Sequence, residues 1–205
     1  MAVLSKLRIL DRLQKRVTEA DSLVITPLLK MNDAFDSDSI DLRLGFYFLL
    51  PKTPPELFFD PSSRISESSY TRVHVPPDGH LVIPAHQTVL GATLEFIKLP
   101  HDVSGQILTK SSVARMFMVI ETAPWIHPYY RGCLTLEIAN VSNTPVQVYP
   151  GMQIGQLILM ETPGAEVPAS IKSSYFGPIY PEPPHFKNVL ADLESIGVRT
   201  KPQKP

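Results

Sequence analysis

Proline is unusually frequent in this chain, with 21 prolines against ten glycines in 205 residues. The proline ring fixes φ and removes a backbone donor, so prolines interrupt helices and central strands and gather in turns. Turn signals recur about every 8–12 residues between short apolar runs, a spacing typical of all-β proteins. The sequence therefore predicts short strands joined by rigid turns, as in a sandwich or barrel.

The clearest strand pattern lies at 39–50, where Ile40, Leu42 and Leu44 alternate with Asp41 and Arg43. An extended segment is expected before it, at 22–29. Further strands are expected at 70–75, 80–83, 88–96, 105–108, 116–120, 132–140, 146–149 and 154–160.

Helical patterns are confined to the two ends of the chain. Apolar residues at helical spacing predict an amphipathic helix over 3–18, and 187–198 predicts a short closing helix. The length fits a single domain over 1–205. Its expected parts are an N-terminal helical arm (1–20), a β core (21–162) and a proline-rich C-terminal tail (163–205).

Charge and cysteine content exclude several classes of protein. The net charge is −1, so no global basic field recruits nucleic acid. Cys133 is the single cysteine, which rules out an intrachain disulfide and favours a reducing compartment. Residues 1–16 interleave charges and hold no apolar run of signal-peptide or membrane-span type. We therefore expect a cytoplasmic protein without a membrane partner.

Metal-dependent deamination is also excluded by pattern. The six histidines are scattered and show no H-x-E spacing. Zinc nucleoside deaminases need H-x-E together with P-C-x-x-C, which a chain with one cysteine does not supply. Neither a Walker A loop nor GxGxxG is present. No protein-bound metal, and no catalytic zinc, is expected.

The segment from Lys110 to Arg115 joins two cations and the hydroxyls of Ser111 and Ser112 at one turn. Hydroxyls, backbone N–H groups and cations match what phosphate oxygens require. Taken alone, the same residues also fit an ordinary exposed polar turn.

Glu137 is a carboxylate within an apolar strand, on the same strand face as Thr135 and Ala139 and opposite Leu136 and Ile138. If that face meets solvent, Glu137 is an ordinary surface residue. If it lines a pocket, burial favours the protonated form and makes Glu137 a candidate proton shuttle. The alternation leaves both readings open.

Two further sets of residues also have alternative readings. Asp41 and Arg43 lie on one face of their strand and form either a weak cross-strand ion pair or a structural pair behind the pocket. Trp125 and Tyr130 are interpreted as mainly structural.

Six blocks of residues, in order over roughly 20–160, resemble the dCTP deaminase family within the dUTPase-like superfamily. They are Ser39-Ile-Asp-Leu-Arg-Leu-Gly45, Leu99-Pro-x-Asp-x-x-Gly105, Lys110-Ser-Ser-x-Ala-Arg115, Trp125-Ile-x-Pro-x-Tyr-x-Gly132, Thr135-Leu-Glu-Ile-x-Asn140 and Pro150-Gly-Met-x-Ile-Gly-Gln-Leu157. Each block alone is a weak signal, whereas the ordered set is specific.

The resemblance implies a mainly β fold, a distorted β-barrel or jelly roll of the dUTPase type. It implies a homotrimer with active sites between subunits and a deoxynucleoside triphosphate bound with Mg²⁺. The implied reaction is hydrolytic deamination of dCTP to dUTP and ammonia. Some members also hydrolyse dUTP to dUMP and pyrophosphate.

The resemblance also implies roles for individual residues. Glu137 matches the catalytic glutamate, which takes a proton from water as it attacks C4 of cytosine. Ser111 and Arg115 match residues that position the water and the glutamate. The nucleotide-binding positions are Lys110, Ser112, Thr122, Ala123, Trp125, His127, Gln156 and the tail residue Tyr175.

His127 departs from the family pattern, because an aspartate usually stands at this position. A neutral histidine still hydrogen-bonds to a hydroxyl but differs in charge and reach. This change argues against hydrolysis of the triphosphate. Glu137 with Ser111 and Arg115 predicts deamination of dCTP to dUTP as the main function. One alternative is a nucleotide-binding or regulatory protein with altered or lost catalysis; a second is a dUTP pyrophosphatase or a bifunctional deaminase.

Overall fold

The structure is a computed structural model that describes residues 2–29, 38–52, 67–121, 123–162, 177–185 and Gly197. Its larger sheet has six strands in the order β4-β3-β6-β10-β8, with β1 beside β6. These strands are β1 (Val24–Thr26), β3 (Tyr47–Pro51), β4 (Tyr70–His74), β6 (Thr88–Lys98), β8 (Met118–Ile120) and β10 (Arg131–Asn140).

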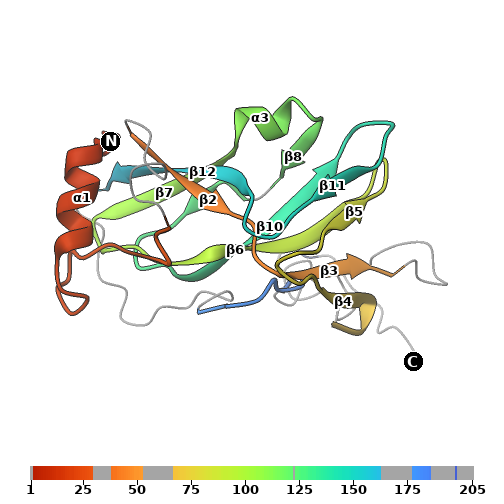
Figure 1. The fold of residues 1–205 in the computed structure, drawn as a ribbon. Coiled ribbons are helices and arrows are strands. Elements are labelled where there is room, and N and C mark those ends of the chain that lie inside the picture. The colour runs from red at the N-terminus through yellow and green to blue at the C-terminus, as the bar shows by residue number, and fades with distance from the viewer. Residues whose placement is uncertain are drawn as a thin grey trace.

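A four-stranded sheet in the order β2-β12-β7-β9 forms a second layer against β6 and β10 (Figure 1). Its strands are β2 (Ser39–Arg43), β7 (Val103–Thr109), β9 (Trp125–Ile126) and β12 (Gln153–Glu161). A small third sheet pairs β5 (Leu81–Ile83) with β11 (Val146–Val148). The helical elements are α1 (Lys6–Gln14), α3 (Ser111–Ala114) and the 3₁₀ turn η1 (Glu67–Ser69).

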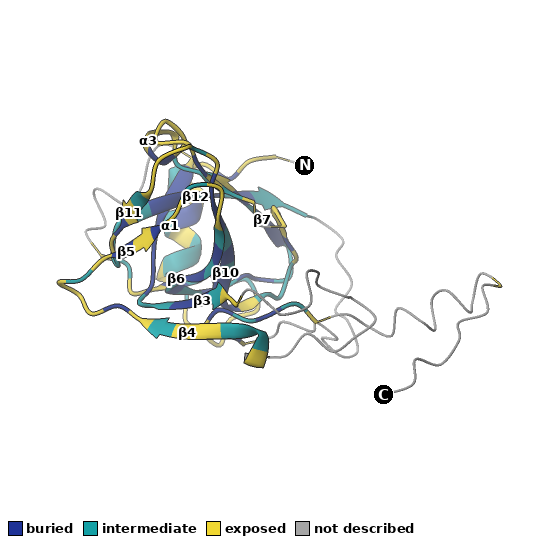
Figure 2. Ribbon diagram, turned by 90° about the vertical axis from the view of Figure 1, so that its right-hand side faces the viewer, coloured by how far each residue is buried: buried dark blue, intermediate teal, exposed yellow. Residues whose placement is uncertain are grey.

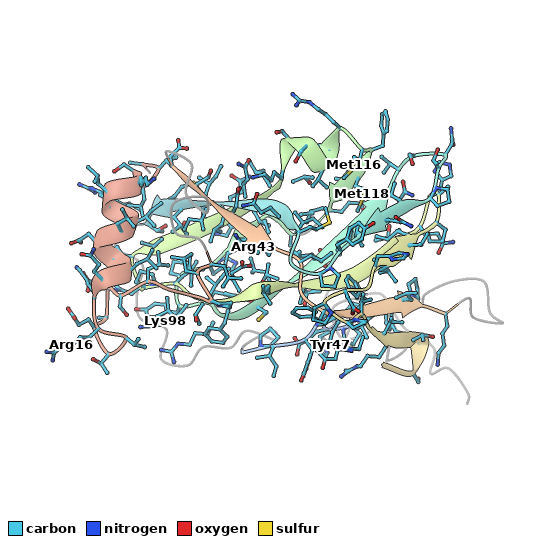
Figure 3. The ribbon with its side chains drawn as sticks, viewed as in Figure 1. Arg16, Arg43, Tyr47, Lys98, Met116 and Met118 are labelled. Carbon is cyan, nitrogen blue, oxygen red and sulfur yellow. The ribbon has the colours of Figure 1, made fainter. Side chains whose placement is uncertain are left out.

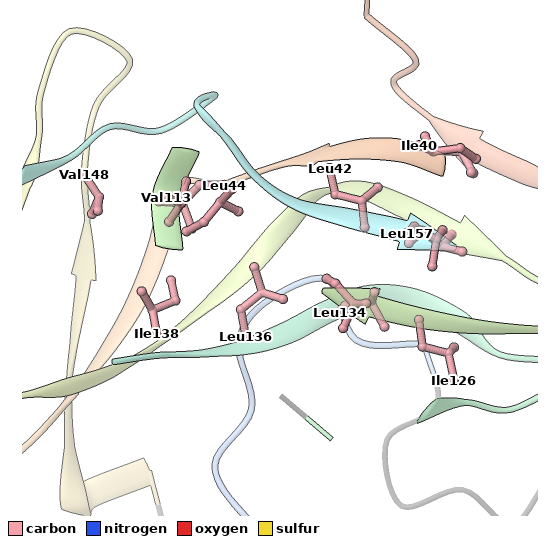
Figure 4. Packing of buried hydrophobic residues seen from close by; sticks show 14 of the residues in the cluster. Ile40, Leu42, Leu44, Val113, Ile126, Leu134, Leu136, Ile138, Val148 and Leu157 are labelled. Atoms are coloured by element: carbon pink, nitrogen blue, oxygen red, sulfur yellow. The ribbon is translucent and has the colours of Figure 1, made fainter. Parts of the chain in front are cut away.

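The core lies between the two layers. Leu42 and Leu157 of the four-stranded sheet point toward Leu134, Leu136 and Ile138 of β10 (Figure 4). Buried residues gather on the strands of both layers, whereas the ends around α3 and β4 are largely exposed (Figure 2). The mainly β, jelly-roll-like prediction is confirmed, although the described sheets do not join into one closed barrel.

The strand expected at 39–50 is in fact two strands in different sheets. β2 ends at Arg43 and β3 begins at Tyr47. At the break, the Gly45 N–H donates to the Ala92 carbonyl at 2.8 Å, and a Cβ on Gly45 would lie 3.0 Å from that oxygen. The chain therefore crosses between layers where only glycine allows so close an approach to β6.

The N-terminal helix is shorter than the 3–18 expected from periodicity, because the residues before it are extended. Val3 pairs with Met160, and the Leu4 N–H donates to the Leu159 carbonyl at 2.8 Å. α1 is fastened to the sheet by Arg12, which binds both oxygens of Asp102 at 2.9 and 2.5 Å. Among the described residues, none of the helices has the length and apolar content needed to span a membrane.

The C-terminal segment 177–185 runs beside β10. The Gly177 N–H donates to the Arg131 carbonyl at 2.8 Å, and the Cys133 N–H donates to the Pro178 carbonyl at 2.7 Å. Tyr180 stacks edge-on against Tyr47 of β3, with ring centroids 4.7 Å apart. The closing helix expected at 187–198 falls outside the described residues, apart from Gly197.

Candidate functional site

Strand β10 holds Glu137 on the face that points away from the core. Leu136 and Ile138 are fully buried between the layers, whereas Thr135 and Glu137 are half-buried on the opposite face. The alternation expected from the sequence is confirmed. One carboxylate oxygen, Glu137 Oε2, is buried and has no hydrogen-bond partner among the described residues. Leaving such an oxygen unpaired is costly, so it is a candidate to contact a ligand.

The C-terminal segment contributes to the same face of β10. The Glu182 N–H donates to the Thr135 hydroxyl at 3.2 Å, two residues from Glu137. Pro181 and Pro183 are buried on either side of this contact. Glu182 Oε2 is a second buried oxygen without a described partner. No local sequence pattern predicts this contact, since residues 135 and 182 lie far apart in the chain.

α3 presents the hydroxyl and basic side chains of the predicted phosphate turn. Its start is fixed by the Lys110 carbonyl, which accepts from the N–H groups of Val113 and Ala114 at 2.9 and 3.0 Å. Val113 is buried in the core and anchors the turn. Ser111, Ser112 and Arg115 are exposed, so two hydroxyls and a guanidinium are available to a ligand.

Asp41 and Arg43 each bind a different partner. Asp41 Oδ2 forms an ion pair with the Lys110 ammonium. Arg43, near the middle of the molecule in Figure 3, binds Glu95 of β6 through its backbone N–H at 2.8 Å and its guanidinium at 3.3 Å. The Asp41 and Arg43 side chains are both about nine-tenths buried. Of the two interpretations left open by the sequence, a weak exposed ion pair does not fit, because both pairs lie largely out of water.

The three predicted catalytic residues do not meet within one chain. Among the described side chains, no hydrogen bond or ion pair joins Glu137 to Ser111 or Arg115. Val113 of α3 packs on the core side of β10, whereas Glu137 points to the other side. Among the described residues, the contacts of one chain therefore do not join the three side chains into one hydrogen-bonded group.

Comparison with known proteins identifies the family. A family model described as dCTP deaminase-like matches residues 3–162. A protein of Coprothermobacter proteolyticus named dCTP deaminase, dUMP-forming, is 35% identical over 176 residues, which cover 84% of this chain and 92% of that protein. The chain belongs to the dCTP deaminase-like family. This membership confirms the prediction of a dCTP deaminase-like hydrolase.

A second named relative agrees with this family assignment, and a solved structure supports the fold. A protein of Mycobacterium avium, also named dCTP deaminase, dUMP-forming, is 39% identical over 151 residues, covering 71% of this chain and 78% of that protein. The crystal structure of 2'-deoxycytidine 5'-triphosphate deaminase from Agrobacterium tumefaciens is 22% identical, with a TM-score of 0.58. That match covers 77% of this chain and 47% of the solved chain, and it supports the fold.

The remaining predicted residues of this family member are scattered over its surface. Ala123, Trp125 and His127 are exposed, and Trp125 lies opposite Gln106 in the pairing of β9 with β7. Gln156 is half-buried in β12. Thr122 and Tyr175 lie outside the described residues. Of the nucleotide-binding candidates, Gln156 lies in β12 and Lys110 and Ser112 lie at α3, whereas Ala123, Trp125 and His127 lie in or next to β9.

Burial makes two groups near β10 poor participants in acid–base chemistry. It raises the pKa of the Cys133 thiol to about 11, with a further contribution from Glu95. Burial also raises the pKa of Tyr130, whose hydroxyl donates to the Cys133 carbonyl at 2.9 Å. Both groups stay protonated near neutral pH and act structurally. Among the described residues, His, Cys, Asp and Glu form no group of three that would hold a metal ion.

Proposed function

We propose that this protein catalyses the hydrolytic deamination of dCTP with release of ammonia. Family membership and the names of the relatives support this substrate. The observation that carries the proposal is the Glu137 carboxylate, which has one buried oxygen on the non-core face of β10 with no partner in the described part of the chain. Such an oxygen is suited to accept a proton from a bound water.

In the proposed reaction, Glu137 takes a proton from the water that attacks C4 of cytosine. The new C–O bond forms as Glu137 passes that proton to the ring nitrogen. Glu137 then takes the remaining proton from the C4 hydroxyl and delivers it to the amino group, so that the C–N bond breaks, C4 becomes a carbonyl and ammonia leaves. Ser111 and Arg115 orient the water and stabilise charge during these steps. No metal-bound nucleophile takes part in this sequence.

The triphosphate is assigned to the α3 turn. Lys110 and Ser112 supply an ammonium and a hydroxyl there, and Gln156 lies nearby in β12. Mg²⁺ would enter with the nucleotide, as the resemblance to the family implies. The ion would neutralise part of the phosphate charge.

A homotrimer completes the site in this proposal. Besides the separation of Glu137 from α3, an exposed apolar surface supports contact between copies. This β8 patch consists of Met116, Phe117, Val119 and Val141, which are 36–64% exposed. Its members are contiguous, because the Val141 N–H donates to the Phe117 carbonyl at 2.9 Å. Contiguous exposed apolar side chains are typical of protein–protein contacts.

Phe117→Asp is expected to convert the assembled protein to monomers and to abolish deamination, because it places a charge in the β8 patch. Sedimentation velocity measures the mass, and ammonia release measures activity. Leu7→Asp is the matched control, since Leu7 is 79% exposed on α1, away from the patch. An active Phe117→Asp monomer would contradict both the shared site and the trimer.

A second candidate is a bifunctional enzyme that releases dUMP. The relatives from Coprothermobacter proteolyticus and Mycobacterium avium are named dUMP-forming, so they give no support to dUTP as the final product predicted from the sequence. His127, where an aspartate is usual, was the reason for predicting that hydrolysis would stop at dUTP. The two candidates share the deamination step.

Incubation with Mg²⁺ and either dCTP or dUTP, followed by ion-exchange chromatography, tests the proposal. Conversion of dCTP to dUTP supports a deaminase alone. Conversion of dCTP to dUMP and pyrophosphate supports the bifunctional enzyme and contradicts the interpretation of His127. Absence of turnover, combined with nucleotide binding, would instead support the regulatory alternative.

A further inference from the structure

A polar cluster lies where β2 and β12 run beside the α3 turn. In the register of these strands Asp41 is directly opposite Gln156, so both side chains project from the same face of the sheet. The other face carries Leu42 and Leu157, which point into the core (Figure 4). Lys110 reaches this cluster through the ion pair of its ammonium with Asp41 Oδ2.

The backbone of Lys110 is fixed as firmly as its side chain. Its N–H donates to the Ile154 carbonyl of β12 at 3.0 Å, and its carbonyl accepts the first two bonds of α3. The Lys110 side chain is 23% exposed, so part of it remains accessible to solvent. Of its three donors, the bond to Asp41 uses one.

Asp41 is more deeply buried than a surface ion pair requires. Its side chain is 8% exposed, and Asp41 Oδ1 is buried without a hydrogen-bond partner among the described residues. A buried carboxylate with an unpaired oxygen is costly. This unfavourable burial is explained if Asp41 serves to order Lys110. The lysine side chain is a flexible four-carbon stem, and without a partner it would adopt many rotamers.

We propose that Asp41 is a positioning residue for the polyphosphate of the substrate. It holds the Lys110 ammonium across β12 and beside Gln156, so that the two remaining ammonium donors face the phosphate oxygens. Asp41 itself does not touch the phosphates, and its negative charge is balanced by Lys110. This inference rests on the proposed function, which assigns the triphosphate to the α3 turn.

A double-mutant cycle on nucleotide affinity tests whether Asp41 acts through Lys110. Calorimetry with dCTP and Mg²⁺ is carried out in a Glu137→Gln background, which is expected to make turnover slow compared with the titration. Asp41→Asn and Lys110→Ala are each expected to raise the Kd about tenfold, as loss of one charge-assisted contact does. The double variant is expected to bind no more weakly than Lys110→Ala alone, because coupled residues are not additive.

Additive effects of the two substitutions, or an unchanged Kd for Asp41→Asn, would overturn the inference. Asp102→Asn is the control, because it removes a carboxylate that binds Arg12 of α1, away from the cluster, and should leave the Kd unchanged. Asp41→Glu keeps the charge and is expected to recover part of the affinity. A simple loss of folding would lower the melting temperature without producing this recovery.

The outcomes separate the inference from the proposed function. Additive effects in a protein that deaminates dCTP contradict the role of Asp41 alone. Non-additive effects in a protein without turnover support the role of Asp41 and contradict the deaminase. Absence of dCTP binding in the Glu137→Gln background contradicts the phosphate assignment and the inference together.

Discussion

Glu137→Gln is expected to lower kcat for dCTP deamination by about a thousandfold, within the range contributed by general acid–base groups. Glutamine keeps the shape of the side chain but neither accepts the proton from water nor returns it to the ring. The dCTP affinity should stay within about threefold of the original, since the proposed role acts in the transition state. Ammonia release under saturating dCTP measures kcat, and calorimetry measures binding.

Glu121→Gln is the matched control for this experiment. Glu121 is an exposed carboxylate beside the same strand, and its N–H donates to the Glu137 carbonyl at 2.8 Å. Its side chain has no part in the proposed chemistry, so activity should be retained. Full activity of Glu137→Gln, or an equal loss in both variants, would remove Glu137 from the mechanism.

The orientation of Glu137 could be predicted from the sequence because it depends only on local geometry. In a strand, successive side chains point to opposite faces, so Leu136 and Ile138 in the core place Glu137 on the other face. The character of that face could not be predicted. It depends on segment 177–185, which is brought to Thr135 by contacts between distant parts of the chain.

The polar residues of β2 could also be located from the sequence, but their partners could not. Alternation identified Asp41 and Arg43 as polar positions on one face of an apolar strand. Asp41 binds Lys110, which lies 69 residues further along the chain in a turn. Arg43 binds Glu95, which lies 52 residues further along in strand β6. Only the stacking of the two layers brings these groups together. The break at Gly45 was missed for the same reason, because the carbonyl of Ala92 imposes it.

Arg43→Met is expected to destabilise the folded protein by about 3–5 kcal/mol, the usual effect of breaking a buried ion pair. The Arg43 and Glu95 side chains are 10% and 1% exposed, so the substitution leaves Glu95 buried without its partner. It also removes the guanidinium bond to the Leu29 carbonyl at 3.2 Å. Urea unfolding at neutral pH measures the free energy, and the midpoint should fall without a change in slope.

The pH dependence of the stability lost in Arg43→Met tests whether the unpaired Glu95 carboxylate causes that loss. Burial already raises the pKa of Glu95 above its ordinary value of 4.5, although its bonds to Arg43 oppose the shift. An acid whose pKa is raised by folding contributes full stability below its unfolded value and loses it as pH rises through the folded value. Without Arg43 the pKa of Glu95 should rise further, so the loss of unfolding free energy in Arg43→Met should be larger at pH 8 than at pH 5.

Arg43→Met combined with Glu95→Met removes both charges and should recover much of the stability, because well-packed apolar replacements of buried pairs are often neutral. A deficit that does not vary with pH and persists in the double variant would show that Arg43 stabilises the fold by packing and its bond to Leu29, and that its charge has little effect.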